Sequence, residues 1–174
     1  MAGFFSRLTG RAPAPQASAP APAVAPAPKP APSVRDAGLP LEEFFTQDHR
    51  ACDELWAEVE ASSARPEAFA QALRAFDARM RRHFAWEEDL LFPAIEKATG
   101  MHGMGPTEIM RQEHRQMKGL LDQMAGAEPQ EVLDQGDTLM MLIQQHNSKE
   151  EMMLYPMGQE ALWASWPELR GRLV

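Results

Sequence analysis

The chain has 174 residues and a formal net charge of -8, from 17 lysines and arginines against 25 aspartates and glutamates. This length allows one domain, or one domain with a tail, and the acidic balance excludes the broad basic surface of a general nucleic-acid-binding protein. Cys52 is the only cysteine, which rules out an intramolecular disulfide and favours a cytoplasmic location. No apolar run approaches the roughly 20 residues that a transmembrane helix needs.

The N-terminal part of the chain is predicted to be a disordered arm. Nine of the 15 prolines fall in residues 1–40, and residues 12–38 are rich in alanine and proline, which indicates a semi-rigid linker. Residues 1–11 contain Phe4, Phe5 and Leu8, which would share one face of a helix. They are a candidate docking peptide for a partner protein or a membrane surface, and the alternative is a terminus without a role.

Residues 39–174 are predicted to fold as an all-α, antiparallel up-down four-helix bundle with a short C-terminal cap. Apolar residues recur at spacings of three, four and seven in four segments, and no alternating pattern indicates a strand. The four segments begin at Pro40, Pro66, Pro106 and Pro129. The first is expected to end near residues 62–64, the second near Pro93 or Gly100, the third at Gly126 and the fourth at Pro156, with the tail around Trp163 and Trp166 folding back.

Each predicted helix places one histidine on its apolar face. These residues are His49, His83, His114 and His146, and two of the helices add a glutamate four residues later, Glu87 and Glu150. A lone core histidine is ordinarily hydrogen-bonded, and a lone His-x-x-x-Glu is ordinarily a surface ion pair. Four imidazoles and two carboxylates in one core must instead be paired or bound to metal. The repetition therefore predicts a dinuclear metal site with six nitrogen and oxygen ligands.

Four stretches of the sequence resemble the hemerythrin-like (HHE cation-binding) domain family. They begin at His49, His83, Glu113 and His146, and the element His-x-x-x-Glu followed by Phe/Tyr-Pro occurs twice, at 83–93 and 146–156. The resemblance covers about residues 40–160. It implies an up-down bundle around a non-haem di-iron centre, with two iron ions and a bridging oxo or hydroxo group.

The same resemblance implies roles for individual residues. The four histidines would be iron ligands, with Glu87 and Glu150 bridging the two ions. Glu151 is the alternative to Glu150 as the last carboxylate ligand. Oxygen-carrying members have a further histidine four residues before the one matched by His114, and this chain has Met110 there. An open position on each iron would suit a ligand that bridges both metals, so reversible oxygen carriage is disfavoured unless His102 or Tyr155 supplies the missing ligand.

The sequence is interpreted as a cytoplasmic protein that binds or reacts with O₂, NO or peroxide. Weak peroxidase or NO-scavenging activity is compatible with this interpretation, and enzymatic turnover is left open. The alternatives are an iron-handling protein and an oxygen, iron or redox sensor whose N-terminal arm docks to a partner. Asp48, Glu88 and Glu113 flank the ligands and are candidates to orient the outer ring nitrogens.

Overall fold

The computed structural model describes residues 38–173, and all regular structure in that range is helical. Its elements are α1 (Leu41–Ala61), α2 (Pro66–Trp86), η1 (Glu87–Leu91), α3 (Phe92–Thr99), α4 (Pro106–Met124), α5 (Pro129–Lys149), η2 (Glu150–Leu154), α6 (Tyr155–Leu162) and α7 (Trp166–Arg170), where η denotes a π-helix. The all-α class is therefore confirmed for the described residues. The predicted docking peptide and linker, residues 1–38, lie outside this range apart from Gly38.

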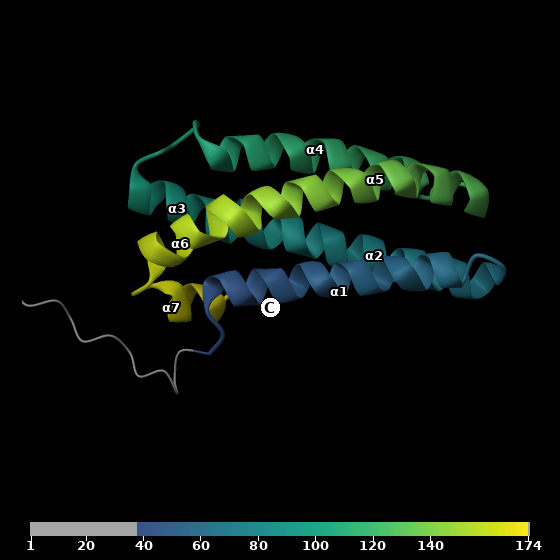
Figure 1. The fold of residues 1–174 in the computed structure, drawn as a ribbon, viewed down its shortest axis with the longest axis horizontal. Helices are drawn as coiled ribbons and strands as arrows, with labels where there is room; N and C mark the ends of the chain where they lie inside the picture. Colours follow the sequence, from purple (N-terminus) through teal and green to yellow (C-terminus); the bar gives the residue numbers. More distant parts are fainter. Residues whose placement is uncertain (1–37, 174) are drawn as a thin grey trace, which may run out of the picture. The chain divides into compact units, whose positions relative to one another are not determined.

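Four long helical stretches lie side by side, and successive stretches run in opposite directions (Figure 1). The second stretch comprises α2, η1 and α3 without a break, and the fourth comprises α5, η2 and α6. Helix α1 packs on α2, α4 packs on α5, and α6 contacts both α1 and α3. The four helical segments expected from the apolar periodicity are all present, and short links leave antiparallel neighbours as the economical arrangement.

The expected end of the fourth segment at Pro156 is wrong. The chain stays helical through Pro156 as far as Leu162, and it also continues past Pro93 to Thr99. A proline inside an α-helix lacks a donor and pushes against the carbonyl four residues earlier. Here a π-helical turn comes just before each proline, and its wider loop of backbone accommodates the ring.

Each π-turn also changes which side chains share a face. In a regular α-helix, residues five apart point about 140° away from each other, whereas one π-turn brings them into line. The turn η2 thus aligns Tyr155 with Glu150, and η1 aligns Phe92 with Glu87. Both aromatic rings consequently join the face of the helix that carries the glutamates.

The buried apolar side chains form two clusters, and the four histidines at 49, 83, 114 and 146 belong to neither. On α1, Phe45 belongs to one cluster and Cys52 to the other, with His49 between them. The cluster that contains Phe45 also includes Trp166 and Leu169 of α7. The indole N–H of Trp166 donates a hydrogen bond of 2.8 Å to the carbonyl of Leu39, just before α1.

Trp56 approaches Gly136 of α5 so closely that we expect no larger residue to fit there without strain. A Cβ at this position would lie 2.1 Å from both Cη2 and Cζ2 of the indole. Overpacking of this kind costs about 1–3 kcal/mol, and the better helix propensity of alanine offsets only about 0.5–1 kcal/mol. We expect Gly136→Ala to lower the free energy of unfolding by about 1–2 kcal/mol in urea denaturation.

Gly119 in α4 is the matched control, because a Cβ there meets no atom within 4 Å. Gly119→Ala should therefore gain about 0.5–1 kcal/mol. Equal stabilisation by the two substitutions would contradict the packing argument.

Candidate metal centre

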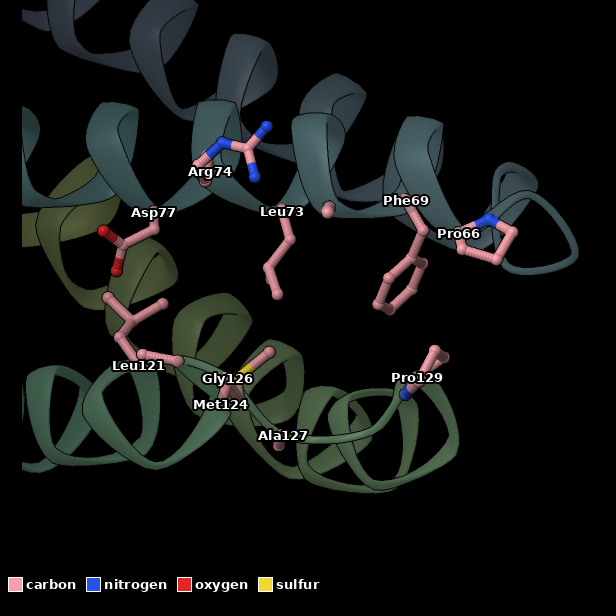
Figure 2. A pocket seen from close by; sticks show the side chains of 12 residues that line it. Pro66, Phe69, Leu73, Arg74, Asp77, Leu121, Met124, Gly126, Ala127 and Pro129 are labelled. Atoms are coloured by element: carbon pink, nitrogen blue, oxygen red, sulfur yellow. The ribbon is translucent and has the colours of Figure 1, made fainter.

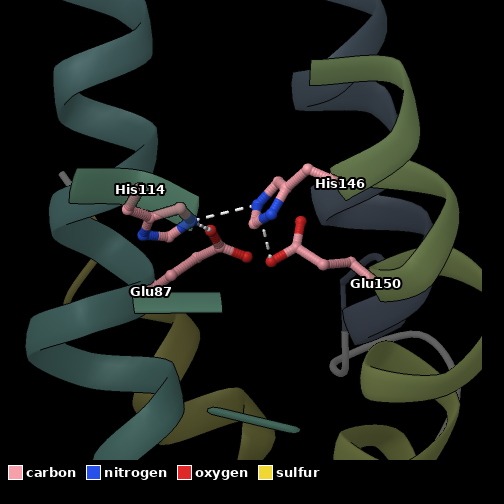
Figure 3. Close-up of side chains that lie close together, drawn as sticks. All are labelled: Glu87, His114, His146 and Glu150. Carbon is pink, nitrogen blue, oxygen red and sulfur yellow. Dashed lines mark hydrogen bonds and ion pairs between the residues drawn. The ribbon is translucent and has the colours of Figure 1, made fainter. Parts of the chain in front are cut away.

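The structure brings the six side chains predicted as ligands into one buried layer. His49 comes from α1, His83 from α2, His114 from α4 and His146 from α5, while Glu87 and Glu150 each occupy the first position of a π-turn. Their exposed fractions lie between 0 and 4%. Figure 3 shows four of these residues, Glu87, His114, His146 and Glu150, with their side chains pointing toward one another.

These side chains form two groups, in each of which the potential ligand atoms lie within 4.8 Å of one another. One group contains Glu87, His114, His146 and Glu150, and the other contains His49, His83 and Glu150. Glu150 belongs to both groups. Each group could therefore hold a metal ion, with Glu150 common to the two groups.

Within each histidine pair, the Nε2 atoms face each other. They lie 3.2 Å apart in His49 and His83, and 3.0 Å apart in His114 and His146. The Nδ1 atom of every ring is turned outward toward a carboxylate oxygen. The four distances are 2.8 Å from His49 to Glu151, 3.0 Å from His83 to Asp48, 2.8 Å from His114 to Glu88 and 2.9 Å from His146 to Glu113.

This pattern determines which ring nitrogen is available to bind a metal. An ionised carboxylate only accepts hydrogen bonds, so each Nδ1 carries the proton and each neutral ring keeps its lone pair on Nε2. Two facing lone pairs cannot bond to each other, and a cation between them removes the conflict. Imidazoles whose second nitrogen is held by a carboxylate are the usual form of histidine in metal sites.

Glu87 and Glu150 each contact both histidine pairs. Oε2 of Glu87 lies 3.3 Å from Nε2 of His83 and 3.3 Å from Nε2 of His114. Glu150 places Oε1 3.2 Å from Nε2 of His146 and Oε2 3.3 Å from Nε2 of His49. Oε2 of Glu87 and Oε1 of Glu150 are nevertheless buried without a hydrogen-bond partner. Unpartnered buried carboxylate oxygens beside imidazole nitrogens fit a site that binds metal cations.

Protonation can replace the cations only in part. Burial alone would lower the pKa of His83, but the Glu87 carboxylate and the hydrogen bond to Asp48 raise it to about 10. The pKa of His146 is also raised, because the Glu150 carboxylate outweighs the effect of burial. One ring of each facing pair thus binds a proton strongly, and a metal ion must displace that proton.

Three of the outer carboxylates are themselves paired with cationic side chains. Asp48 accepts from Arg79, Glu88 lies 2.8 Å from the Lys118 ammonium, and Glu113 accepts from Lys149. Burial raises the pKa of Glu88, but the hydrogen bonds from His114 and Lys118 outweigh it and bring the pKa to about 2. The suggestion that Asp48, Glu88 and Glu113 orient the ring nitrogens is confirmed.

Glu151 supplies the fourth outer carboxylate. The sequence allowed Glu151 as a ligand in place of Glu150, but its side chain contacts the outer nitrogen of His49, whereas Glu150 points into the layer. The repeat in the sequence could have revealed this role, since Glu151 follows Glu150 as Glu88 follows Glu87. The arrangement of histidines and glutamates on α1, α2 and η1 thus recurs on α4, α5 and η2.

Tyr155 is one of the two candidates for a replacement ligand, and the structure places its hydroxyl inside the layer. The oxygen lies 2.8 Å from Oε1 of Glu87, 2.9 Å from Oε2 of Glu150 and 3.0 Å from Nε2 of His49. Burial and the two carboxylate charges raise the pKa of this hydroxyl well above its ordinary value. In the metal-free protein the hydroxyl therefore stays protonated and donates a hydrogen bond to one of the glutamates.

The other candidate for a replacement ligand lies elsewhere. His102 is exposed in the link between α3 and α4, so the structure does not bring it to the layer. Met110, at the position of the additional histidine, is buried in the same apolar cluster as Phe92 and Tyr155. A thioether thus occupies the place of the fifth imidazole.

The layer of predicted ligands is distinct from the apolar pocket shown in Figure 2. That pocket has a volume of about 710 Å³ and lies between α2 and the link from α4 to α5, with Phe69, Leu73 and Met124 in its wall. None of the six predicted ligands lines it. Phe69 precedes His83 by 14 residues, or roughly 21 Å along a helix, so the pocket and the layer lie at different levels of the fold.

Comparison with known proteins gives one match. The model of the hemerythrin HHE cation binding domain family matches residues 41–158, a range that contains all six of these side chains. No curated protein and no solved structure matches the chain at a significant level. Within the described residues, no helix has the length and apolar character that crossing a membrane would require.

Proposed function

The chain belongs to the hemerythrin HHE cation-binding domain family, and from this premise we propose that it holds two iron ions and binds or reacts with O₂, NO or peroxide. The observation that carries the proposal is the pair of ligand groups that share Glu150, in which the Nε2 atoms of two histidine pairs face each other. The proposal includes an up-down four-helix bundle in which every helix contributes one histidine.

Each ion would take two histidines and share two carboxylates with its neighbour. One would be held by His49 and His83, the other by His114 and His146, and Glu87 and Glu150 contact both pairs. Bound iron supplies redox chemistry and Lewis acidity. The protein fixes the ring orientation through the outer carboxylates and keeps the layer dry, so only a small molecule would fit beside the metals.

Reaction with an oxidant is favoured over reversible oxygen transport. Transport in this family is associated with a fifth histidine, and Met110 provides a buried thioether at that position instead. The exposed position of His102 also argues against compensation from the link between α3 and α4. A centre with four nitrogen ligands in place of five leaves an open metal position at which a small oxidant would bind.

Metal analysis combined with optical spectroscopy tests the proposal. The full-length protein should bind about two irons per chain, and its iron-dependent absorption should change on reduction and on exposure to O₂, NO and peroxide. Irreversible spectral change or catalytic loss of peroxide would support reaction with an oxidant. A fully reversible cycle with O₂ would instead indicate oxygen binding, and ready transfer of iron to a chelator after mild reduction would indicate iron handling.

His102→Ala is the matched control, because it removes an exposed histidine outside the layer. It should leave the iron content and the spectrum unchanged. A folded protein that neither contains nor takes up iron would overturn the proposal.

A further inference from the structure

The hydroxyl of Tyr155 occupies a position in the layer that only one half of the internal repeat provides. The residue equivalent to Tyr155 in the first half is Phe92, since each follows its glutamate by five residues at the end of a π-turn. The centroid of the Phe92 ring lies 5.6 Å from that of the His114 ring, at an interplanar angle of 25°. The Tyr155 ring lies 5.5 Å from the His49 ring at 33°. The two aromatic rings are placed alike, so the hydroxyl is the chemical difference between them.

This hydroxyl lies on the side of the layer that has fewer ligand atoms. The group around His114 and His146 includes both glutamates, whereas the group around His49 and His83 includes Glu150 alone. The Tyr155 oxygen is 3.0 Å from Nε2 of His49 and 2.9 Å from the Glu150 oxygen that faces the same nitrogen. It adds an oxygen donor on the side whose ligand group has three residues, against four in the other group.

We propose that Tyr155 is a ligand of the metal ion held by His49 and His83, bound through its phenolate oxygen. The O–H bond breaks, the oxygen bonds to the metal, and the proton is released to solvent. The bound cations offset the two carboxylate charges that keep the hydroxyl protonated in the metal-free protein. This inference rests on the proposed di-iron function.

The consequence is that the two metal positions differ. Tyr155 closes a coordination position on the His49 and His83 side, while Phe92 offers no donor atom on the His114 and His146 side. An incoming small molecule would then find its open position on the ion held by His114 and His146. In oxygen carriers the fifth histidine makes the two ions unequal. Here a phenolate on the ion held by His49 and His83 would make them unequal instead.

Phenolate bound to ferric iron gives a charge-transfer band in the visible region and resonance-enhanced ring vibrations. Tyr155 is the only tyrosine in the chain, so such vibrations can be assigned without ambiguity. The experiment measures iron content, visible absorption and resonance Raman spectra of the full-length ferric protein and of Tyr155→Phe. We expect the wild type to show the band and the ring vibrations, and the variant to lose both.

The substitution keeps the aromatic ring, and Phe92 shows that phenylalanine is accommodated at the equivalent position, so Tyr155→Phe should fold. Met110→Leu is the matched control, because it alters a neighbouring buried side chain of the same cluster without an oxygen donor. It should retain the visible band. Retention of either one or two irons by Tyr155→Phe, without the band, supports the proposal.

The failure of this inference can be told apart from the failure of the proposed function. A wild-type protein with two irons but no phenolate vibrations, and a Tyr155→Phe spectrum that superimposes on it, would overturn the ligand role and leave the di-iron function intact. A wild-type protein that binds no iron would overturn both.

Discussion

The Glu150→Ala protein is expected to remain helical and to bind at most one metal ion per chain. Glu150 is the only side chain shared by both ligand groups, and each of its oxygens faces a histidine of a different pair. Its removal leaves Glu87, which contacts His83 through Oε2, as the remaining carboxylate beside the pair of His49 and His83. We expect the affinity for the second ion to fall by more than about 100-fold, beyond the roughly 10–100-fold loss typical of an outer partner.

Glu151→Ala is the natural comparison, because the two glutamates are adjacent in the sequence but contact opposite nitrogens of His49. Glu151 holds the outer nitrogen at 2.8 Å and does not enter the layer. This variant should keep two ions, with an affinity roughly 10–100-fold lower. Metal content after dialysis and titration calorimetry measure the difference, and circular dichroism checks the helical content. If Glu151→Ala lost the metals while Glu150→Ala kept them, the assignment of the two residues would be reversed.

The identity of the six converging side chains could be predicted because it depends on one period. His83 and Glu87 are four residues apart, as are His146 and Glu150, and a regular helix places such pairs on the same face. The prolines at the starts of the helices indicated where each segment begins. Neither inference requires knowledge of how the helices pack.

The details that depend on the π-turns could not be predicted in the same way. At 100° per residue, Tyr155 would point about 140° away from Glu150, and its hydroxyl would not reach the layer. A proline at 156 equally suggested a helix end, whereas the structure absorbs it in η2. A π-turn adds a residue to one turn for reasons of tertiary packing, which the local sequence pattern does not encode.

The choice between Glu150 and Glu151 depended on packing for a similar reason. Both residues lie one turn after His146, and spacing alone allows either to face the core. The structure separates them because the adjacent position is needed by His49 of α1, a residue about 100 positions away in the chain. Pairings between residues on different helices, such as that between Asp48 and Arg79, could likewise not be predicted from the local pattern.

Removal of metal is expected to lower the stability of the fold by several kcal/mol. A ligand that binds only the native state contributes about 4 kcal/mol at a free concentration 1,000 times its Kd. For a chain of this size each kcal/mol corresponds to about 2–4 °C in Tm, so ferrous iron under anaerobic conditions should raise Tm by roughly 8–16 °C. Differential scanning calorimetry of metal-free and loaded protein measures this shift, and His102→Ala should show the same shift as the wild type.

The stabilisation by metal should also grow as the pH rises. In the metal-free protein the pKa of His83 is about 10, above its ordinary value of 6.5. The stability that this protonated ring contributes is therefore fully present below pH 6.5 and is lost progressively as the pH approaches 10. A metal ion must displace the same proton, so its apparent Kd should improve about tenfold per pH unit for each proton displaced in this range. As the pH rises, the metal-free protein loses stability and the metal binds more tightly. The metal-induced rise in Tm should therefore be larger at pH 8 than at pH 6. A shift that is equal at the two pH values, or larger at pH 6, would show that the metal does not replace the proton on His83.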